Sequence, residues 1–305
     1  MIMIRYTYND KLRIKVTDQC DFSCPFCHAE GGIGAENIVL DNNFVEAIKM
    51  LQPIFKRAHI TGGEPVLYKN LNRILDVLQD TGYRVSITSN GFFALEKNID
   101  ILERFDYINF SVHSFRNDYV SQLIKNHLAS EHVVSIVKKN IDELRKIVPV
   151  RINTVVSDRA KQQNLEEIIE YCGERSIELK LVPEWKSRAE AKKYIDILLD
   201  KNGFSLYETV YLIPGSNVRK RYRNKYGQII EVKNIEFFFP NFICHDCSIK
   251  ENCQEGFSFL RMGGNPLYLQ PCIFKPKMNV EEFRQNMLED LYNMFREAEK
   301  NCLHS

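Results

Sequence analysis

Between Leu12 and about Val182, short runs rich in β-branched residues alternate with longer segments of helical periodicity. In one helical segment, Leu165, Ile168, Ile169 and Cys172 form a single apolar face. Strands that alternate with helices predict a parallel sheet with right-handed crossovers. Six such units are too few for a closed eight-stranded barrel, so we expect an α/β fold with an open, partial (β/α)6 TIM-like barrel. The predicted strands are Leu12–Thr17, Arg57–Ile60, Arg84–Thr88, Tyr107–Val112, Val150–Val156 and Glu178–Val182.

The pattern changes after Trp185, where the charged segment Lys186–Lys201 predicts a helix or a linker. Two further strands are predicted at Leu206–Ile213 and Gln228–Phe239, on either side of a polar loop that holds Arg219–Lys225. We interpret that basic loop as solvated, with phosphate or carboxylate recruitment as the alternative. The change in pattern predicts a barrel domain over residues 1–185 and a second domain over residues 186–305.

A last helix is predicted near the end of the sequence. Asn279 offers an N-cap, and Glu282 follows three residues later, as in a capping box. Phe283, Leu291 and other apolar residues supply the buried face of this helix.

Nine cysteines, an odd number, are unevenly placed in the 305 residues. Clustered cysteines in a chain without a signal peptide indicate metal binding or catalysis before disulfides. The first residues lack a signal-peptide pattern, and no segment reaches transmembrane length. A formal net charge of +1 gives no global attraction to nucleic acid or anionic membrane. We therefore expect a cytoplasmic protein with no nucleic-acid or membrane partner.

The first cysteine group, Cys20, Cys24 and Cys27, follows directly after a predicted strand. Three thiolates this close along the chain can converge on one metal centre. Three ligands for a cluster of four irons would leave one iron open, as catalytic metal sites require. The spacing alone leaves a zinc site open as the alternative, with His28 as the fourth ligand.

The second group contains Cys244, Cys247, Cys253 and Cys272. Four cysteines match a closed site, either zinc or a second [4Fe–4S] cluster, and the spacing alone favours zinc. Cys172 is expected in the hydrophobic core, and Cys302 is expected to have no role.

The CxxxCxxC spacing, with Phe26 before the last cysteine, resembles the signature of the radical S-adenosylmethionine (SAM) superfamily. Thr61-Gly62-Gly63-Glu64-Pro65 resembles the superfamily's GGE segment, and Ser89-Asn90-Gly91 resembles its next strand end. The resemblance implies that Cys20, Cys24 and Cys27 hold a catalytic [4Fe–4S] cluster whose open iron binds SAM. Reductive cleavage of SAM then gives a 5′-deoxyadenosyl radical, which takes a hydrogen atom from the substrate.

The same resemblance implies further SAM contacts and an external electron donor such as flavodoxin or ferredoxin. The implied cofactor-binding residues are Phe26, Gly62, Gly63, Glu64, Asn90, Ser111, Asn153 and Val182. The family context also favours an auxiliary [4Fe–4S] cluster for the late cysteines, held in a small C-terminal domain of twitch or SPASM type.

Within the superfamily the chain resembles the branch of the GTP 3′,8-cyclase of molybdenum-cofactor synthesis, from about Leu12 to Phe274. The resemblance is carried by Leu12–Cys20, Arg151-Ile-Asn-Thr154, Glu178–Val182 and Leu260–Phe274. Three features depart from that branch: the additional Cys253, Phe259 at an arginine position, and an end, Asn301–Ser305, without the Gly-Gly tail. These departures favour a different substrate.

We therefore expect an enzyme with two [4Fe–4S] clusters that modifies a nucleotide- or sugar-like small molecule in cofactor or natural-product biosynthesis. The auxiliary cluster would carry electrons or bind substrate. Arg261 is a candidate substrate contact, and so is His113, for which a structural hydrogen-bonded role is the alternative. Glu184 and Trp185 are expected to border the site.

Three rival functions stay open at this point. The chain could be a peptide-modifying SPASM or twitch maturase, although only about ten residues precede the first predicted strand, which disfavours a built-in peptide-recognition domain. The GTP cyclase itself is the second rival, and a structural zinc protein is the non-enzymatic one.

Overall fold

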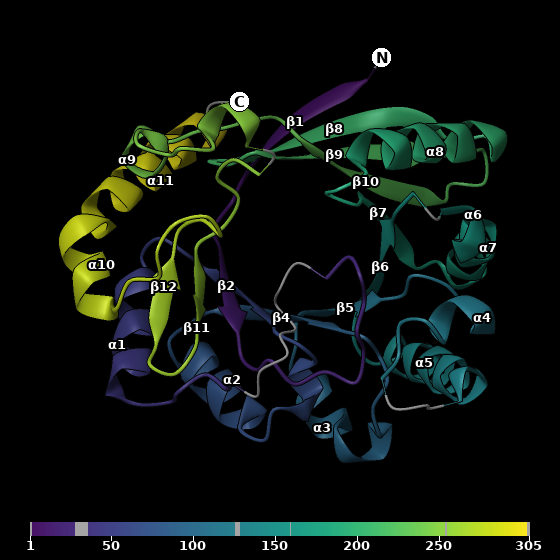
Figure 1. The fold of residues 1–305 in the computed structure, drawn as a ribbon, viewed down its shortest axis with the longest axis horizontal. Helices are drawn as coiled ribbons and strands as arrows, with labels where there is room; N and C mark the ends of the chain where they lie inside the picture. The colour runs from purple at the N-terminus through teal and green to yellow at the C-terminus, as the bar shows by residue number, and fades with distance from the viewer. Residues whose placement is uncertain (1, 28–35, 126–128, 159, 254, 304–305) are drawn as a thin grey trace.

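The computed structural model describes residues 2–27, 36–125, 129–158, 160–253 and 255–303. Within these residues, one sheet of 12 strands curls around an open interior, and helices cover its outer face (Figure 1). The strand order is β1-β8-β9-β10-β7-β6-β5-β4-β3-β2-β11-β12. The fold is the expected α/β half-barrel.

The six central strands confirm the six predicted from the sequence, and each is parallel to its neighbours. They are β2 (Lys11–Lys15), β3 (Arg57–Thr61), β4 (Arg84–Ser89), β5 (Tyr107–Ser111), β6 (Val150–Val156) and β7 (Glu178–Pro183). The helices between them are α1 (Asn42–Leu51), α2 (Leu71–Asp80), α3 (Ile99–Leu102), α4 (Asn117–Val120), α5 (Ser130–Leu144), α6 (Ala160–Gln163) and α7 (Leu165–Arg175). Short 3-10 turns η1 (Pro65–Leu67) and η2 (Leu95–Lys97) follow β3 and β4.

The two faces of the curled sheet differ in polarity. In β2, Leu12 and Ile14 are fully buried in the hydrophobic core, whereas the alternate residues Lys11, Arg13 and Lys15 are only partly buried. Because side chains alternate across a strand, the charged set faces away from that core, into the half-barrel. Strands β6 and β7 show the same alternation, so the interior is polar there and suited to binding a ligand.

The sheet continues beyond β7 through α8 (Arg188–Lys201), β8 (Ser205–Ile213), β9 (Asn217–Arg223) and β10 (Ile229–Ile235). Strand β9 corrects a sequence prediction, because Arg219–Lys225 was expected in a solvated loop. Arg221 donates to Glu208 at 3.0 Å, and Arg219 lies 3.5 Å from the Glu231 carboxylate. Carboxylates on neighbouring strands therefore compensate these arginines inside the sheet.

Strand β1 (Met3–Tyr8) was not predicted. It lies parallel to β8 at one edge of the sheet, so the pairing brings together residues about 200 positions apart in the sequence. Its partner strand, β8, was expected. In β1 itself, Ile4, Tyr6 and Tyr8 alternate with Arg5 and Thr7, a strand signal that the sequence prediction overlooked.

At the other edge, β11 (Arg261–Gly263) lies parallel to β2 and pairs with β12 (Tyr268–Gln270). Helix α9 (Asn241–Cys244) and the turn η3 (Lys250–Asn252) precede these strands; α10 (Val280–Asn286) and α11 (Leu288–Leu303) follow them. The predicted capping box is present, with Asn279 and Glu282 bonded to each other's backbone N–H. Phe295 of α11 packs edge-on against Phe55, 5.0 Å between ring centroids.

The division into domains at residue 185 stays a prediction, and the sheet runs without interruption across that position. Among the described helices, none combines the length and apolarity needed to cross a membrane.

Candidate active site

The first cysteine group lies in the loop that follows β2, across the open side of the half-barrel (Figure 1). Backbone bonds tie this loop to the segment after α4. Ser23 donates to the Leu123 carbonyl at 2.6 Å, and Lys125 donates to the Asp21 carbonyl at 2.8 Å. The loop is therefore held at both the β2 end and the β5 side of the barrel.

The three cysteines of this loop are mutual neighbours. Cys20 and Cys24 are half-buried, and Cys27 is exposed. Burial raises the pKa of Cys24 to about 12, and the Cys27 and Cys20 thiolates raise it further. Such thiols need a cationic partner to ionise, and the donor set suits an iron–sulfur cluster.

The zinc alternative depended on His28, which lies outside the described residues. Among the side chains that the structure describes, no three His, Cys, Asp or Glu residues gather as the ligands of a single metal ion would.

The end of β3 is bonded to the chain just before Cys20. The Gly63 N–H donates to the Thr17 carbonyl at 2.7 Å, and the Glu64 N–H donates to the Gln19 carbonyl at 2.6 Å. A Cβ at position 63 would lie 2.1 Å from the Gln19 carbonyl oxygen. Only glycine fits this contact, so Gly63 has a role within the chain itself. The contacts of Gly62 and Gly63 with SAM stay a prediction.

Glu64 connects the end of β3 to the end of β4. Its fully buried carboxylate accepts from the Val66 N–H at 3.1 Å and from the Asn90 N–H at 2.6 Å. Burial raises the pKa of Glu64 to about 7, against the effect of these hydrogen bonds. Asn90 in turn places its Nδ2 3.9 Å from the Cys20 sulfur. The described contacts give Glu64 a positioning role, and its contact with SAM stays a prediction.

Ser111, the last residue of β5, pairs with Asn153 in the middle of β6. His113 follows β5, and its Nδ1 accepts from the Val155 N–H at 3.1 Å. This bond places the ring proton on Nε2, and burial lowers the pKa of His113 to about 4, so the ring is neutral. The ring also contacts Phe26 edge-on, 4.6 Å between centroids. His113 is therefore both a hydrogen-bonded structural residue and a support for the cysteine loop.

The four late cysteines converge from three places in the chain, although 28 positions separate the first from the last. Cys244 ends α9, Cys253 follows η3, and Cys272 follows β12. Together with Cys247 they line one small cavity. Burial raises the pKa of Cys244, and the other three thiolates of the group raise it further. Four converging thiols fit a closed metal centre, and Cys253 belongs to the set.

A cleft of about 520 Å³ adjoins the first cysteine group. Phe26 and Cys27 line it on one side, and Arg261 and Ile273 line it on the other. Arg261 lies close enough to Cys272 to lower its pKa, although burial, which raises it, dominates. A volume in this range suits a small-molecule ligand. Cys27 of the first group thus lines a cavity of substrate size, and Ile273, the residue after Cys272, lines it from the side of the second group.

Sequence reasoning placed some of the cleft correctly and missed other parts. Glu184 and Trp185 line it, as expected. Arg13 and Lys15 also line it and were not singled out. Their alternation with buried Leu12 and Ile14 was the available signal, because charges on one face of a buried strand must face a polar interior. Val182 lines the neighbouring cavity beside Phe26. The core position of Cys172 is confirmed, since it is fully buried.

Comparison with known proteins agrees with this geometry. Residues 14–172 match the radical SAM superfamily profile. A protein of Saccharolobus solfataricus named "Probable GTP 3′,8-cyclase" is 30% identical over 229 residues, 73% of each chain. A protein of the same name from Sulfolobus acidocaldarius is 27% identical over 249 residues, 78% of this chain and 76% of the relative.

Among solved structures, Streptococcus suis SuiB bound to SAM is similar in fold, with a TM-score of 0.60 and 15% identity. The match covers 93% of this chain and 66% of the SuiB chain, just under two thirds of its length. A second structure of SuiB, bound to the precursor peptide SuiA, matches equally well, with 16% identity. The radical SAM profile matches residues 14–172, more than half of the chain, and the Saccharolobus solfataricus relative is 30% identical. The chain is therefore a member of the radical SAM superfamily.

Proposed function

We propose that this radical SAM enzyme modifies a small molecule held in the cleft between two [4Fe–4S] clusters. The observation that carries the proposal is a 520 Å³ cavity lined by Cys27 of the first group and by Arg261, whose charge acts on Cys272 of the second group. Cys20, Cys24 and Cys27 would hold the cluster that supplies the electron for SAM cleavage. Cys244, Cys247, Cys253 and Cys272 would hold the auxiliary cluster.

The chain's own residues support this arrangement in separate ways. Glu64 and Asn90 fix the cysteine loop against β3 and β4, and the His113 ring packs edge-on against Phe26. Arg261 lies between the cleft and Cys272, where a cation would stabilise the negative charge of a thiolate-bound cluster. Trp185 and the Phe26 ring give the cleft apolar walls that exclude water.

The auxiliary cluster is proposed to carry electrons rather than to bind substrate through iron. Cys253 joins the other three cysteines around one cavity, so four protein thiolates would occupy all four irons. The same convergence argues against a direct assignment as GTP 3′,8-cyclase, the name that the relatives above carry, because Cys253 is one of the features that depart from that branch.

Peptide modification is the second candidate. It is favoured by the likeness to SuiB, whose structure with a precursor peptide covers 93% of this chain. At this identity the likeness supports the fold alone, and the cleft volume favours a compact ligand over a peptide segment.

We further propose a cytoplasmic site of action with flavodoxin or ferredoxin as the reductant, since free clustered thiols need a reducing compartment. Neither nucleic acid nor membrane is part of the proposal.

Anaerobic reconstitution followed by metal analysis tests the cluster count. The wild-type protein should bind about eight irons per chain, and the Cys247→Ala/Cys253→Ala variant about four. The single variant Cys172→Ala is the matched control, because it removes a buried thiol outside both groups. Zinc in place of iron, or equal iron content in both proteins, would contradict the proposal.

A further inference from the structure

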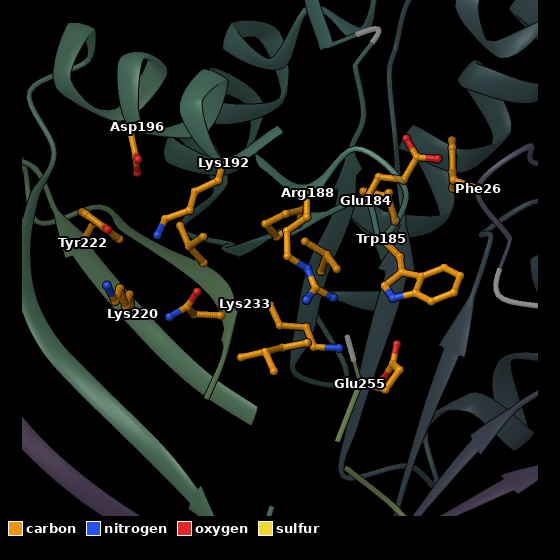
Figure 2. Close-up of a pocket in the computed structure, with 16 residues that line it drawn as sticks. Phe26, Glu184, Trp185, Arg188, Lys192, Asp196, Lys220, Tyr222, Lys233 and Glu255 are labelled. Carbon is orange, nitrogen blue, oxygen red and sulfur yellow. The ribbon is translucent and has the colours of Figure 1, made fainter. Parts of the chain in front are cut away.

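A second, smaller cavity of about 80 Å³ adjoins the cleft. The two cavities share Phe26, Glu184 and Trp185 as lining residues. A substrate lying in the cleft against the cysteine loop can therefore extend one group into this second cavity. Figure 2 shows the residues that line it, which come from the cysteine loop, from β6, from the end of β7, from α8, from β9 and β10, and from the segment that holds Glu255.

Two basic side chains and one carboxylate, that of Glu255, lie at one end of this cavity. Figure 2 shows Arg188 of α8 and Lys233 of β10 pointing toward the same space, beside Trp185. The apolar residues Val155, Val182 and Val232 form part of the wall. Charges in such surroundings are weakly screened, so an ion in this cavity interacts with them more strongly than it would in water.

Lys233 and Lys180 differ in their ion-pair partners. Lys180 lies 3.2 Å from the Glu231 carboxylate, which also compensates the charge of Arg219. Lys233 is two residues farther along β10 than Glu231; within the described part of the chain its ammonium has neither an ion-pair nor a hydrogen-bond partner, and Glu255 is the acid whose charge acts on it most. A half-buried ammonium without a partner destabilises the folded protein unless a ligand supplies the opposite charge.

The surroundings of Lys233 carry an excess of positive charge. Burial lowers the pKa of Lys233 to about 8, and Lys180, Arg13 and Arg188 lower it further, whereas Glu255 opposes the shift. Burial also lowers the pKa of Arg188. The other acids of this cavity are engaged or distant: Glu184 accepts from the Ser187 hydroxyl at 3.0 Å, and Figure 2 shows Asp196 at the opposite end.

We propose that Lys233 and Arg188 bind an oxyanion of the substrate, a phosphate or a carboxylate, while the rest of the substrate lies in the cleft against Phe26. This inference rests on the proposed function and narrows it, because it names the substrate class as an anionic small molecule. An ammonium and a guanidinium from two different elements converge on the oxyanion, as in other phosphate and carboxylate sites.

Calorimetric titration of the reconstituted, SAM-loaded holoenzyme with inorganic pyrophosphate, and separately with malonate, tests the site. Lys233→Met should weaken binding of the preferred anion about tenfold or more, and Lys233→Arg should bind it within a few-fold of wild type. Lys225→Met is the matched control: this lysine is exposed beyond the end of β9 and should leave the affinity unchanged. The stronger-binding probe separates a phosphate site from a carboxylate site.

Protection of Lys233 from acetylation and formation of 5′-deoxyadenosine are measured as well. In the wild-type protein, the preferred anion should slow acetylation of Lys233 by acetic anhydride, as measured by mass spectrometry, and leave Lys225 equally reactive. No binding of either anion, equal affinity in Lys233→Met, or no protection of Lys233 would overturn the oxyanion site. Formation of 5′-deoxyadenosine without substrate is measured in parallel. Its absence in the wild type would contradict the proposed function, whereas the anion titration reports on the oxyanion site by itself.

Discussion

The Glu64 carboxylate accepts a 2.6 Å hydrogen bond from the backbone N–H of Asn90, and this bond joins the ends of β3 and β4 directly behind Cys20. The carboxylate is fully buried and also caps the turn that begins at Pro65. Two strand ends and the cysteine loop therefore share one acidic side chain as a common anchor.

Replacing that anchor by an amide tests its positioning role. In Glu64→Gln, the side-chain NH2 must face either the Asn90 N–H or the Val66 N–H, so one of the two bonds is lost. We expect the free energy of unfolding to fall by about 1–3 kcal/mol, as measured by urea denaturation of the metal-free protein. Glu96→Gln, on an exposed side chain, is the control. A variant as stable as wild type would show that the buried carboxylate is not an anchor.

The His113 ring is expected to support the cysteine loop. His113→Phe keeps an aromatic ring next to Phe26 but removes the acceptor of the Val155 N–H, which lies 3.1 Å from Nδ1. The unpaired N–H should cost about 1–3 kcal/mol of unfolding free energy. His132→Phe, at an exposed position, should leave it unchanged. Equal stability of the two variants in thermal or chemical denaturation would contradict the role of His113.

Loss of the ion pairs that Glu231 of β10 makes should lower the free energy of unfolding more than either change above. Glu231 compensates the charges of Lys180 and Arg219. Burial alone would raise the pKa of Glu231, but the Lys180 ammonium has the largest opposing effect and lowers that pKa to about 2. Glu231→Gln leaves buried cations without their counter-charge and should destabilise the protein by about 3–5 kcal/mol at neutral pH. Glu236→Gln, on an exposed residue after the same strand, is the control. A loss below 1 kcal/mol would show that water compensates these cations.

The affinity of the Lys233 site for an anion should fall as the pH rises. The charged groups that face Lys233 are Glu255, Lys180, Arg13 and Arg188. Because its pKa is lowered to about 8, Lys233 is protonated below that pH and loses its charge above it. Sulfate keeps the same charge throughout this range, so its affinity should fall as the pH rises from 7 through 9 (roughly one pH unit on either side of that pKa). A flat profile in wild type, or the same slope in Lys233→Met, would contradict the assignment.

The six central strands could be predicted because each carries its own signal, a short β-branched run followed by a helical segment. The two cysteine groups could be predicted for the same reason, since their spacing is local. Strand β9 could not, because Arg219 and Arg221 are stabilised in a strand only by Glu208 and Glu231 of neighbouring strands. A basic run has no local feature that distinguishes this arrangement from a solvated loop.

The position of the cleft also depends on contacts between distant segments. Cys27 and Arg261 border one cavity because β11 pairs in parallel with β2, and Arg261 lies opposite Arg13 in that register. No spacing within the sequence encodes this pairing. The oxyanion site was missed because Arg188 and Lys233 come from a helix and a strand that converge only in the folded half-barrel.

The central claim is that Cys20, Cys24 and Cys27 hold a four-iron cluster with one iron open to SAM. Electron paramagnetic resonance of the reduced, anaerobically reconstituted protein, recorded with and without SAM, tests it most directly. SAM should change the signal of one cluster in wild type, and Cys24→Ala should lack that change and form no 5′-deoxyadenosine. A wild-type spectrum that SAM leaves unaltered, or turnover retained in Cys24→Ala, would contradict the claim.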